Sequence, residues 1–75
     1  MGLSSSSLES YALKLSENVE NSSTVKRMMK KAVSEGINEF QICWVVGRAQ
    51  KLSSIRKSQK FWIMIERDFL QFLKV

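Results

Sequence analysis

Few side chains in this 75-residue sequence could take part in catalysis or metal binding. The chain contains no histidine, so no side chain titrates near neutral pH unless its pKa is strongly shifted. A histidine-based triad or metal site therefore cannot be built, and general acid–base catalysis would depend on carboxylates alone. No glycine-rich phosphate loop is present either. We expect a protein that is not an enzyme and that needs no metal or cofactor.

The single cysteine, Cys43, lies in the apolar run from Ile42 to Val46. One thiol cannot form an internal disulfide, and it supplies no Cys/His cluster for zinc. A free cysteine in an apolar run is usually a small buried hydrophobe, and it is typical of a reducing compartment. We therefore expect Cys43 to be buried and the protein to be in a reducing compartment.

Charge is distributed unevenly along the chain, whose formal net charge is +5. Residues 1–23 carry a net charge of −2, whereas residues 24–60 contain nine basic and two acidic side chains. A basic region of this kind can contact nucleic acid phosphates, an acidic partner or solvent alone. The residues that could form one continuous basic face are Lys26, Arg27, Lys30, Arg56, Lys60 and Arg67.

The spacing of apolar residues predicts an all-α protein, a small bundle of three to four short helices. We expect residues 1–7 to form a flexible polar lead-in and residues 8–75 to form a single helical domain. Ser6 and Glu9 make a capping box that would open the first helix. A second helix, capped by a residue within 21–23, is predicted to end at Gly36, because glycine accepts a left-handed conformation. Its apolar face consists of Val25, Met28, Met29, Ala32 and Val33.

A third helix is predicted from its N-cap Asn38 to about Lys51. One side of it carries Phe40, Cys43, Trp44 and Gly47, and the other side carries Ile42, Val45, Val46 and Ala49. A helix that is apolar on two sides packs between neighbours, so we expect helix three to be central and Trp44 to be in the core. Because Gly47 costs about 1 kcal/mol relative to alanine within a helix, we expect a close helix–helix approach there.

A last helix is predicted from a cap at Ser53 or Ser54 to the C-terminus. Its inward stripe consists of Ile55, Trp62, Ile65, Phe69 and Phe72. Five further apolar side chains lie outside this stripe, namely Phe61, Ile63, Met64, Leu70 and Leu73. A domain of this size cannot easily bury all five. We therefore expect some of them to be exposed and to bind a partner protein or a second copy of the chain.

Two alternatives to a protein-binding role remain open. Ala32, Gly36, Ile42 and Val45 have the spacing of a helix-turn-helix, which would make the chain a small basic nucleic-acid-binding protein. Against this alternative, its second helix offers few polar side chains to base edges, so only weak, salt-sensitive binding is expected.

The second alternative is a lipid-anchored protein, because Gly2 and Ser6 fit the N-myristoylation pattern. A single acyl chain anchors only marginally, so the basic face would have to contact acidic lipid as well. Apart from such a modification we expect no membrane contact, because no apolar run approaches the roughly 20 residues of a spanning helix.

Several residues between positions 28 and 70 form a pattern that extends beyond helical periodicity. They are Ala32, Glu35-Gly36, Phe40, Cys43-Trp44, Ala49, Phe61-Trp62, Arg67 and Phe69. With these residues the sequence resembles the ANR family, small negative regulators found with virulence regulons of enteric pathogens. Cys43 stands where that family usually has alanine, and Leu70 stands where it often has cysteine.

The resemblance implies a small cytoplasmic helical protein that binds an AraC/XylS-class transcriptional activator directly and limits its activity. We therefore expect a negative transcriptional regulator that blocks the dimerisation or DNA binding of such an activator. The exposed apolar residues of the last helix would make the contact, and the basic face would steer an acidic partner.

Overall fold

The computed structural model describes residues 2–74, which form four α-helices and include no strand. The helices are α1 (Ser5–Glu17), α2 (Ser22–Ser34), α3 (Glu39–Leu52) and α4 (Gln59–Leu73). The predicted all-α class and the predicted number of helices are confirmed. Within the described range, no helix is both long enough and apolar enough to cross a membrane.

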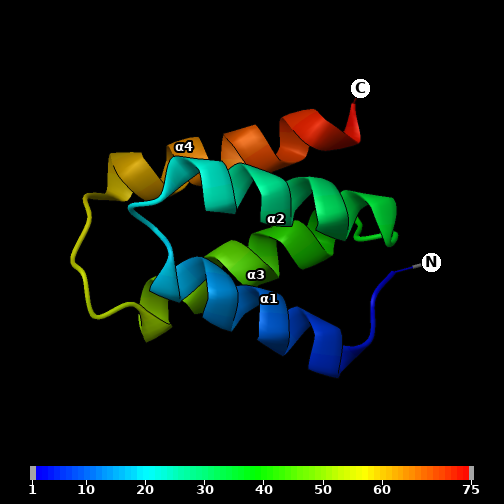
Figure 1. The fold of residues 1–75 in the computed structure, drawn as a ribbon, viewed down its shortest axis with the longest axis horizontal. Helices are drawn as coiled ribbons and strands as arrows, with labels where there is room; N and C mark the ends of the chain where they lie inside the picture. The colour runs from blue at the N-terminus through cyan, green and yellow to red at the C-terminus, as the bar shows by residue number, and fades with distance from the viewer. Residues whose placement is uncertain (1, 75) are drawn as a thin grey trace.

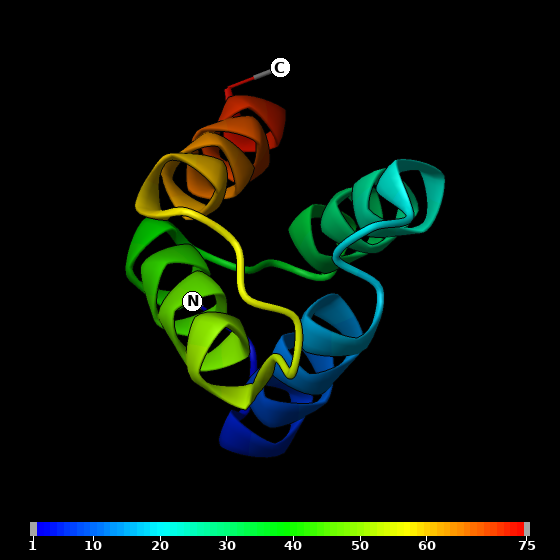
Figure 2. The ribbon, with the colours of Figure 1, turned by 90° about the vertical axis from the view of Figure 1, so that its left-hand side faces the viewer.

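The four helices form a ring in which each one packs against two others (Figures 1 and 2). Both α1 and α4 contact α2 and α3, so α2 and α3 face each other diagonally across the core. Figure 1 shows that α1 and α3 run in one direction, while α2 and α4 run in the other. The central position predicted for helix three is not confirmed, because no helix of this ring lies between all the others.

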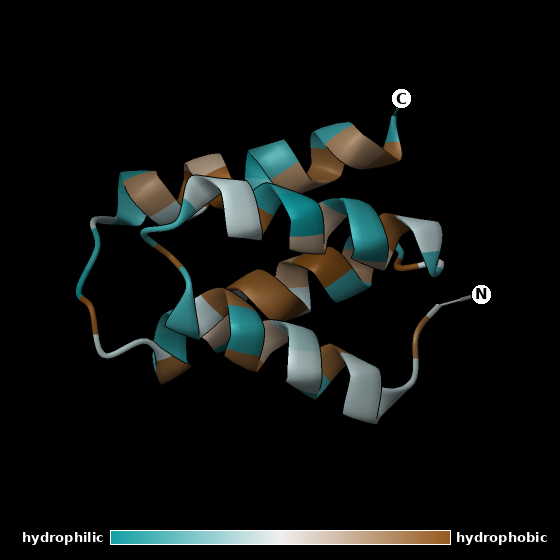
Figure 3. Ribbon diagram, viewed as in Figure 1, coloured by the Kyte–Doolittle hydropathy of each residue, from teal (hydrophilic) through white to brown (hydrophobic). Residues whose placement is uncertain are grey.

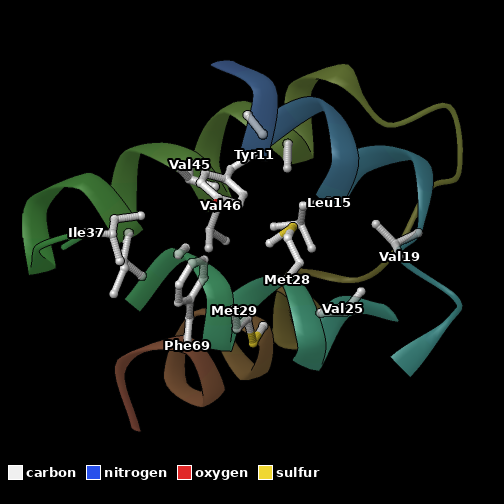
Figure 4. Close-up of a cluster of buried hydrophobic side chains, with 14 of the residues drawn as sticks. Tyr11, Leu15, Val19, Val25, Met28, Met29, Ile37, Val45, Val46 and Phe69 are labelled. Atoms are coloured by element: carbon white, nitrogen blue, oxygen red, sulfur yellow. The ribbon is translucent and has the colours of Figure 1, made fainter. Parts of the chain in front are cut away.

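The interior is filled by side chains from all four helices (Figure 4). The largest fully buried side chains are Leu15, Met29, Ile42, Val45 and Phe69. The predicted inward residues of α2 are confirmed, except that Val33 is only partly buried. In α4, Trp62 and Phe69 are buried as predicted, while Ile65 and Phe72 are partly buried against the same core.

Two predicted helix ends are confirmed. Asn38 caps α3 through a hydrogen bond from the Gln41 amide, and the Gln41 side chain accepts one from the Asn38 amide in return. Gly36 ends α2 with a φ of 104°, which is in the left-handed region. The chain then turns so that the next amide, that of Ile37, donates to the Ala32 carbonyl and its side chain enters the core.

The start of α1 differs from the prediction. Ser4, not Ser6, accepts the capping hydrogen bond, so residues 5–7 are helical and do not belong to a flexible lead-in. Leu3 also packs against the core, and its backbone exchanges two hydrogen bonds of 2.9 Å with the Gln41 side chain. Because residues 4–7 are all serine, each of them could cap a helix, and local sequence does not rank them.

The start of α4 also differs, because α4 begins at Gln59 after the N-cap Ser58. The hydroxyl of Ser53 accepts from the Ile55 amide and donates to the Ile55 carbonyl, which closes a local turn in place of a helix. Ile55 therefore lies in the connection between α3 and α4, where it is 37% exposed, and it is not part of an inward stripe.

The outer side of α3 is the largest departure from prediction. Phe40 is 89% exposed and Trp44 is 45% exposed, and Cys43 is exposed as well. A β-carbon added at Gly47 would meet no atom within 4 Å, so no helix approaches closely there. The expectations of a buried Cys43, a core Trp44 and a close approach at Gly47 are wrong. In the described part of the chain α3 contacts α1 and α4 alone, and these two cover one side of it.

Candidate protein-binding surfaces

A groove lies between the parallel helices α2 and α4, and it encloses about 260 Å³. Its apolar lining comes from Val19, Val25, Met29, Phe61, Met64 and Ile65. Val25 and Met29 are buried, so they form its floor, whereas Met64 is 59% exposed at the wall. The charged residues of α2 are exposed and colour much of this helix teal in Figure 3, and Met64 of α4 stays uncovered beside it.

Lys26 is the basic residue in the groove lining. Two lysine–aromatic contacts lie nearby: the Lys57 ammonium is 5.2 Å from the centre of the Phe61 ring, which lines the groove, and Lys30 of α2 is 5.9 Å from the centre of the Phe72 ring of α4. Two carboxylates are also near: Asp68 lines the groove, and Glu20 pairs with Lys57 at 3.2 Å.

The five apolar residues predicted to bind a partner do not form one surface. Met64 lines the α2–α4 groove together with Phe61. Ile63, 50% exposed, lines a separate hollow beside Arg67 and Leu70. Phe61, Leu70 and Leu73 are partly buried and pack against the core. Only Ile63 and Met64 of the five are therefore largely free for a partner, and they point to different sides of α4.

The six predicted basic residues are all exposed, but they have different neighbours. Lys26 and Lys30 lie along the α2–α4 groove, and Lys60 is in the first turn of α4. Arg27 instead lines a hollow formed with α1, next to Tyr11. Arg56 lies in the connection between α3 and α4, and Arg67 lies beside Ile63. The structure therefore brings two of the six residues together at the groove.

Sequence reasoning missed a second surface, the outer face of α3. We define this outer face as Phe40, Cys43, Trp44 and Gly47, which recur at the spacing of one helix side. A hollow of about 280 Å³ lies over it, lined by Cys43, Trp44, Gly47, Arg48 and Lys51. The apolar pattern on both sides of α3 could have revealed this surface. A ring of four helices covers only one side of each helix, so the second apolar side of α3 has to stay open.

The titratable groups of these surfaces offer little nucleophilic chemistry. Partial desolvation raises the pKa of the Cys43 thiol, and the nearby charge of Glu66 raises it further, so the thiol stays protonated at neutral pH. Burial and a hydrogen bond to Glu35 raise the pKa of Tyr11 to about 12. Within residues 2–74, no three metal-binding side chains come together.

Base reading by the α2–α3 pair has little support in this geometry. The positions of α3 that would face a DNA groove are occupied by Phe40, Cys43, Trp44 and Gly47. These side chains have almost no hydrogen-bonding capacity for base edges. Arg48, the nearest basic residue, pairs with Glu9 at 3.3 Å.

Comparison of this chain with protein-family models, with curated proteins and with solved structures returns no match.

Proposed function

We propose that this chain is a cytoplasmic negative regulator that binds a transcriptional activator of the AraC/XylS class and blocks its dimerisation or DNA binding. The observation that carries the proposal is the α2–α4 groove. It has an apolar floor, a half-exposed methionine at its wall, and Lys26 and Phe61 in its lining. Grooves of this kind bind one side of an amphipathic helix through a few apolar anchors.

The side chains around the groove favour a particular kind of bound segment. Met64 is flexible and polarisable, so it can adapt to an apolar anchor that enters next to it. Lys26, which lines the groove, would face an acidic residue that flanks the anchor, whereas Lys57 is already paired with Glu20. The expected ligand is therefore a helix of the activator with apolar residues on one side and carboxylates at the margin.

The activator class follows from the resemblance to small negative regulators over residues 28–70. In this mechanism the chain performs no chemical step. It covers a helix that the activator needs for pairing with a second copy or for contact with DNA. Inhibition then depends on occupancy, so it increases with the concentration of the chain and reverses on dilution.

The test is a binding titration with each purified AraC/XylS-class activator of the host. The groove variant is Met64→Lys, which places a charge against the anchor. Its matched control is Ile63→Lys, one position earlier and similarly exposed, but on the other side of α4. We expect Met64→Lys to weaken binding about tenfold or more and Ile63→Lys to leave it nearly unchanged. Failure of every activator to bind the unmodified chain would overturn the proposal.

The nucleic-acid alternative is tested in the same assay with duplex DNA of mixed sequence. Binding that depends on Lys26 and Lys30, collapses with added salt and ignores Met64→Lys would replace the activator with DNA as the ligand. If the chain inhibits an activator-dependent promoter through the groove, that promoter's expression recovers with Met64→Lys and not with Ile63→Lys.

A further inference from the structure

We propose that the outer face of α3 pairs with the same face of a second copy, so that two α3 helices lie antiparallel across a twofold axis. This surface is distinct from the α2–α4 groove, and the inference does not rest on the proposed function. It rests on the exposure of Phe40 and Trp44, on the shape of the hollow at Gly47, and on the charges at the two ends of the face.

Exposure points to an interface because Phe40 and Trp44 are large aromatic side chains on a helix that is well packed on its other side. They are 89% and 45% exposed, and they follow one another by a single helical turn. Aromatic residues of this kind dominate the energetics of protein interfaces. Cys43 and Gly47, between and beyond them, are small and allow another helix to come close.

Charge makes the face self-complementary in one orientation only. The acidic end of the face has Glu39 on α3 and Glu66 on α4, both close enough to Cys43 to influence its thiol. The basic end has Arg48 and Lys51, which line the hollow over Gly47. Arg48 already pairs with Glu9 of its own chain at 3.3 Å, so Lys51 contributes most of the positive charge offered to the second copy. An antiparallel pair places the acidic end of each copy against the basic end of the other, whereas a parallel pair would place like charges together.

Shape gives the register of this antiparallel pair. When Phe40 of one copy is opposite Lys51 of the other, Trp44 is opposite Gly47. The bulky indole then enters the hollow of about 280 Å³ that the missing side chain of Gly47 leaves open. This large-against-small match occurs twice, because the twofold axis repeats every contact.

The two surfaces can be occupied at once. The hollow on α3 is lined by α3 residues alone, and α2 does not contact α3 in the described part of the chain. A pair formed through α3 therefore leaves the α2–α4 groove of each copy open.

The first test measures molecular mass by sedimentation equilibrium across a concentration series from micromolar to millimolar. We expect a monomer–dimer equilibrium that Trp44→Ala weakens about 30-fold or more, while circular dichroism shows unchanged helix content. The matched control is Met64→Ala, since Met64 is also well exposed but lies in the groove. A chain that stays monomeric throughout the series, or a dimer unaffected by Trp44→Ala, would overturn the proposal.

The second test uses charge reversal to establish the orientation. Glu39→Lys alone or Lys51→Glu alone creates two repulsive contacts in an antiparallel pair, so each variant should be mainly monomeric. A mixture of the two variants should associate again, because each contact between positions 39 and 51 then joins one lysine and one glutamate. In a parallel pair the unmodified chain would already place like charges together, so neither single variant would associate less than it does. Such a result, or no recovery in the mixture, would exclude the antiparallel pairing.

The single cysteine provides a check on the register. At the proposed register the two Cys43 α-carbons lie about 11–12 Å apart, from the helical rise and the usual distance between packed helices. A bismaleimide of that span should link two copies, whereas direct oxidation to a disulfide should be inefficient. Efficient disulfide formation without the linker would contradict this register.

Discussion

Helix α3 has two apolar faces, and they meet very different surroundings. The inner face, formed by Ile42, Val45, Val46 and Ala49, is almost completely buried against the other helices. The outer face carries the larger side chains, including Phe40 and Trp44, yet it is open. What decides burial here is where α1 and α4 lie, since they cover one side of α3.

The comparison also separates two roles for apolar residues in a chain of 75 residues. The inner residues contribute to folding stability, because their removal leaves a cavity. The outer residues contribute little to the stability of one isolated copy, and their energetic contribution appears when another molecule covers them. Substitutions on the inner face should therefore lower folding stability, whereas substitutions on the outer face should weaken association with another molecule. The following measurements test that difference.

The largest expected effect comes from paired truncations on the two faces. Ile42→Ala removes a fully buried side chain and should lower the free energy of unfolding by about 2–5 kcal/mol. Phe40→Ala, two residues away, should change it by less than about 0.5 kcal/mol. Urea denaturation at a concentration where the chain is monomeric measures both. Equal losses for the two variants would show that the outer face is covered within one copy.

Two glycines provide a second pair with effects of opposite sign. Gly36→Ala should destabilise the fold by about 1–2 kcal/mol, because a φ of 104° is unfavourable for any residue with a β-carbon. Gly47→Ala should stabilise one copy by about 1 kcal/mol, because it improves helix propensity and its β-carbon meets nothing. The same substitution fills the hollow and should weaken pairing. Thermal unfolding and sedimentation measure the two effects separately.

The third prediction concerns a buried group beside the inner face. Tyr11, the single tyrosine, should ionise with a pKa of about 12, against the usual value of about 10. Because the folded state holds this proton more tightly than the unfolded chain, stability should fall as pH rises from about 10 to about 12. An ultraviolet titration measures the pKa directly, and Glu35→Gln should lower it. A pKa of about 10 in the folded chain would show that the phenol is open to water.

The smallest expected effect is on the outer face, at Cys43. Its thiol is accessible, but desolvation and the Glu66 charge raise its pKa, so alkylation at mildly alkaline pH should be slower than for free cysteine. Glu66→Gln should lower the pKa and accelerate alkylation a few-fold. The rate of iodoacetamide labelling, followed by mass, measures this. Labelling that requires unfolding would show a buried thiol and would remove the distinction between the two faces.

Much of the fold was predictable because its determinants are local. The spacing of Val25, Met28, Met29 and Ala32 predicts the inner side of α2, and Gly36 and Asn38 mark the turn that follows. The helix starts at Ser4 and Ser58 were missed, since neighbouring serines offer the same capping chemistry. Which serine caps the helix depends on where packing in the bundle requires that helix to begin.

The candidate surfaces were predictable only in part. An excess of apolar residues on α4 indicated a binding surface, and Met64 does line a groove. Leu70 and Leu73 were assigned to the same surface, but they pack against the core. A helical wheel gives the direction of each side chain around its own axis, and it contains no information about which directions neighbouring helices cover.

The sequence by itself determined the all-helical class, a number of three to four helices, the turn at Gly36 and the excess of apolar side chains over what one small core can hold. These properties depend on hydrogen bonding and side-chain spacing within a few residues. Only the tertiary structure decided that part of the excess lies at the α2–α4 groove and part on the outer face of α3. That division depends on contacts between residues far apart in the chain, because a ring of four helices leaves each member covered on one side.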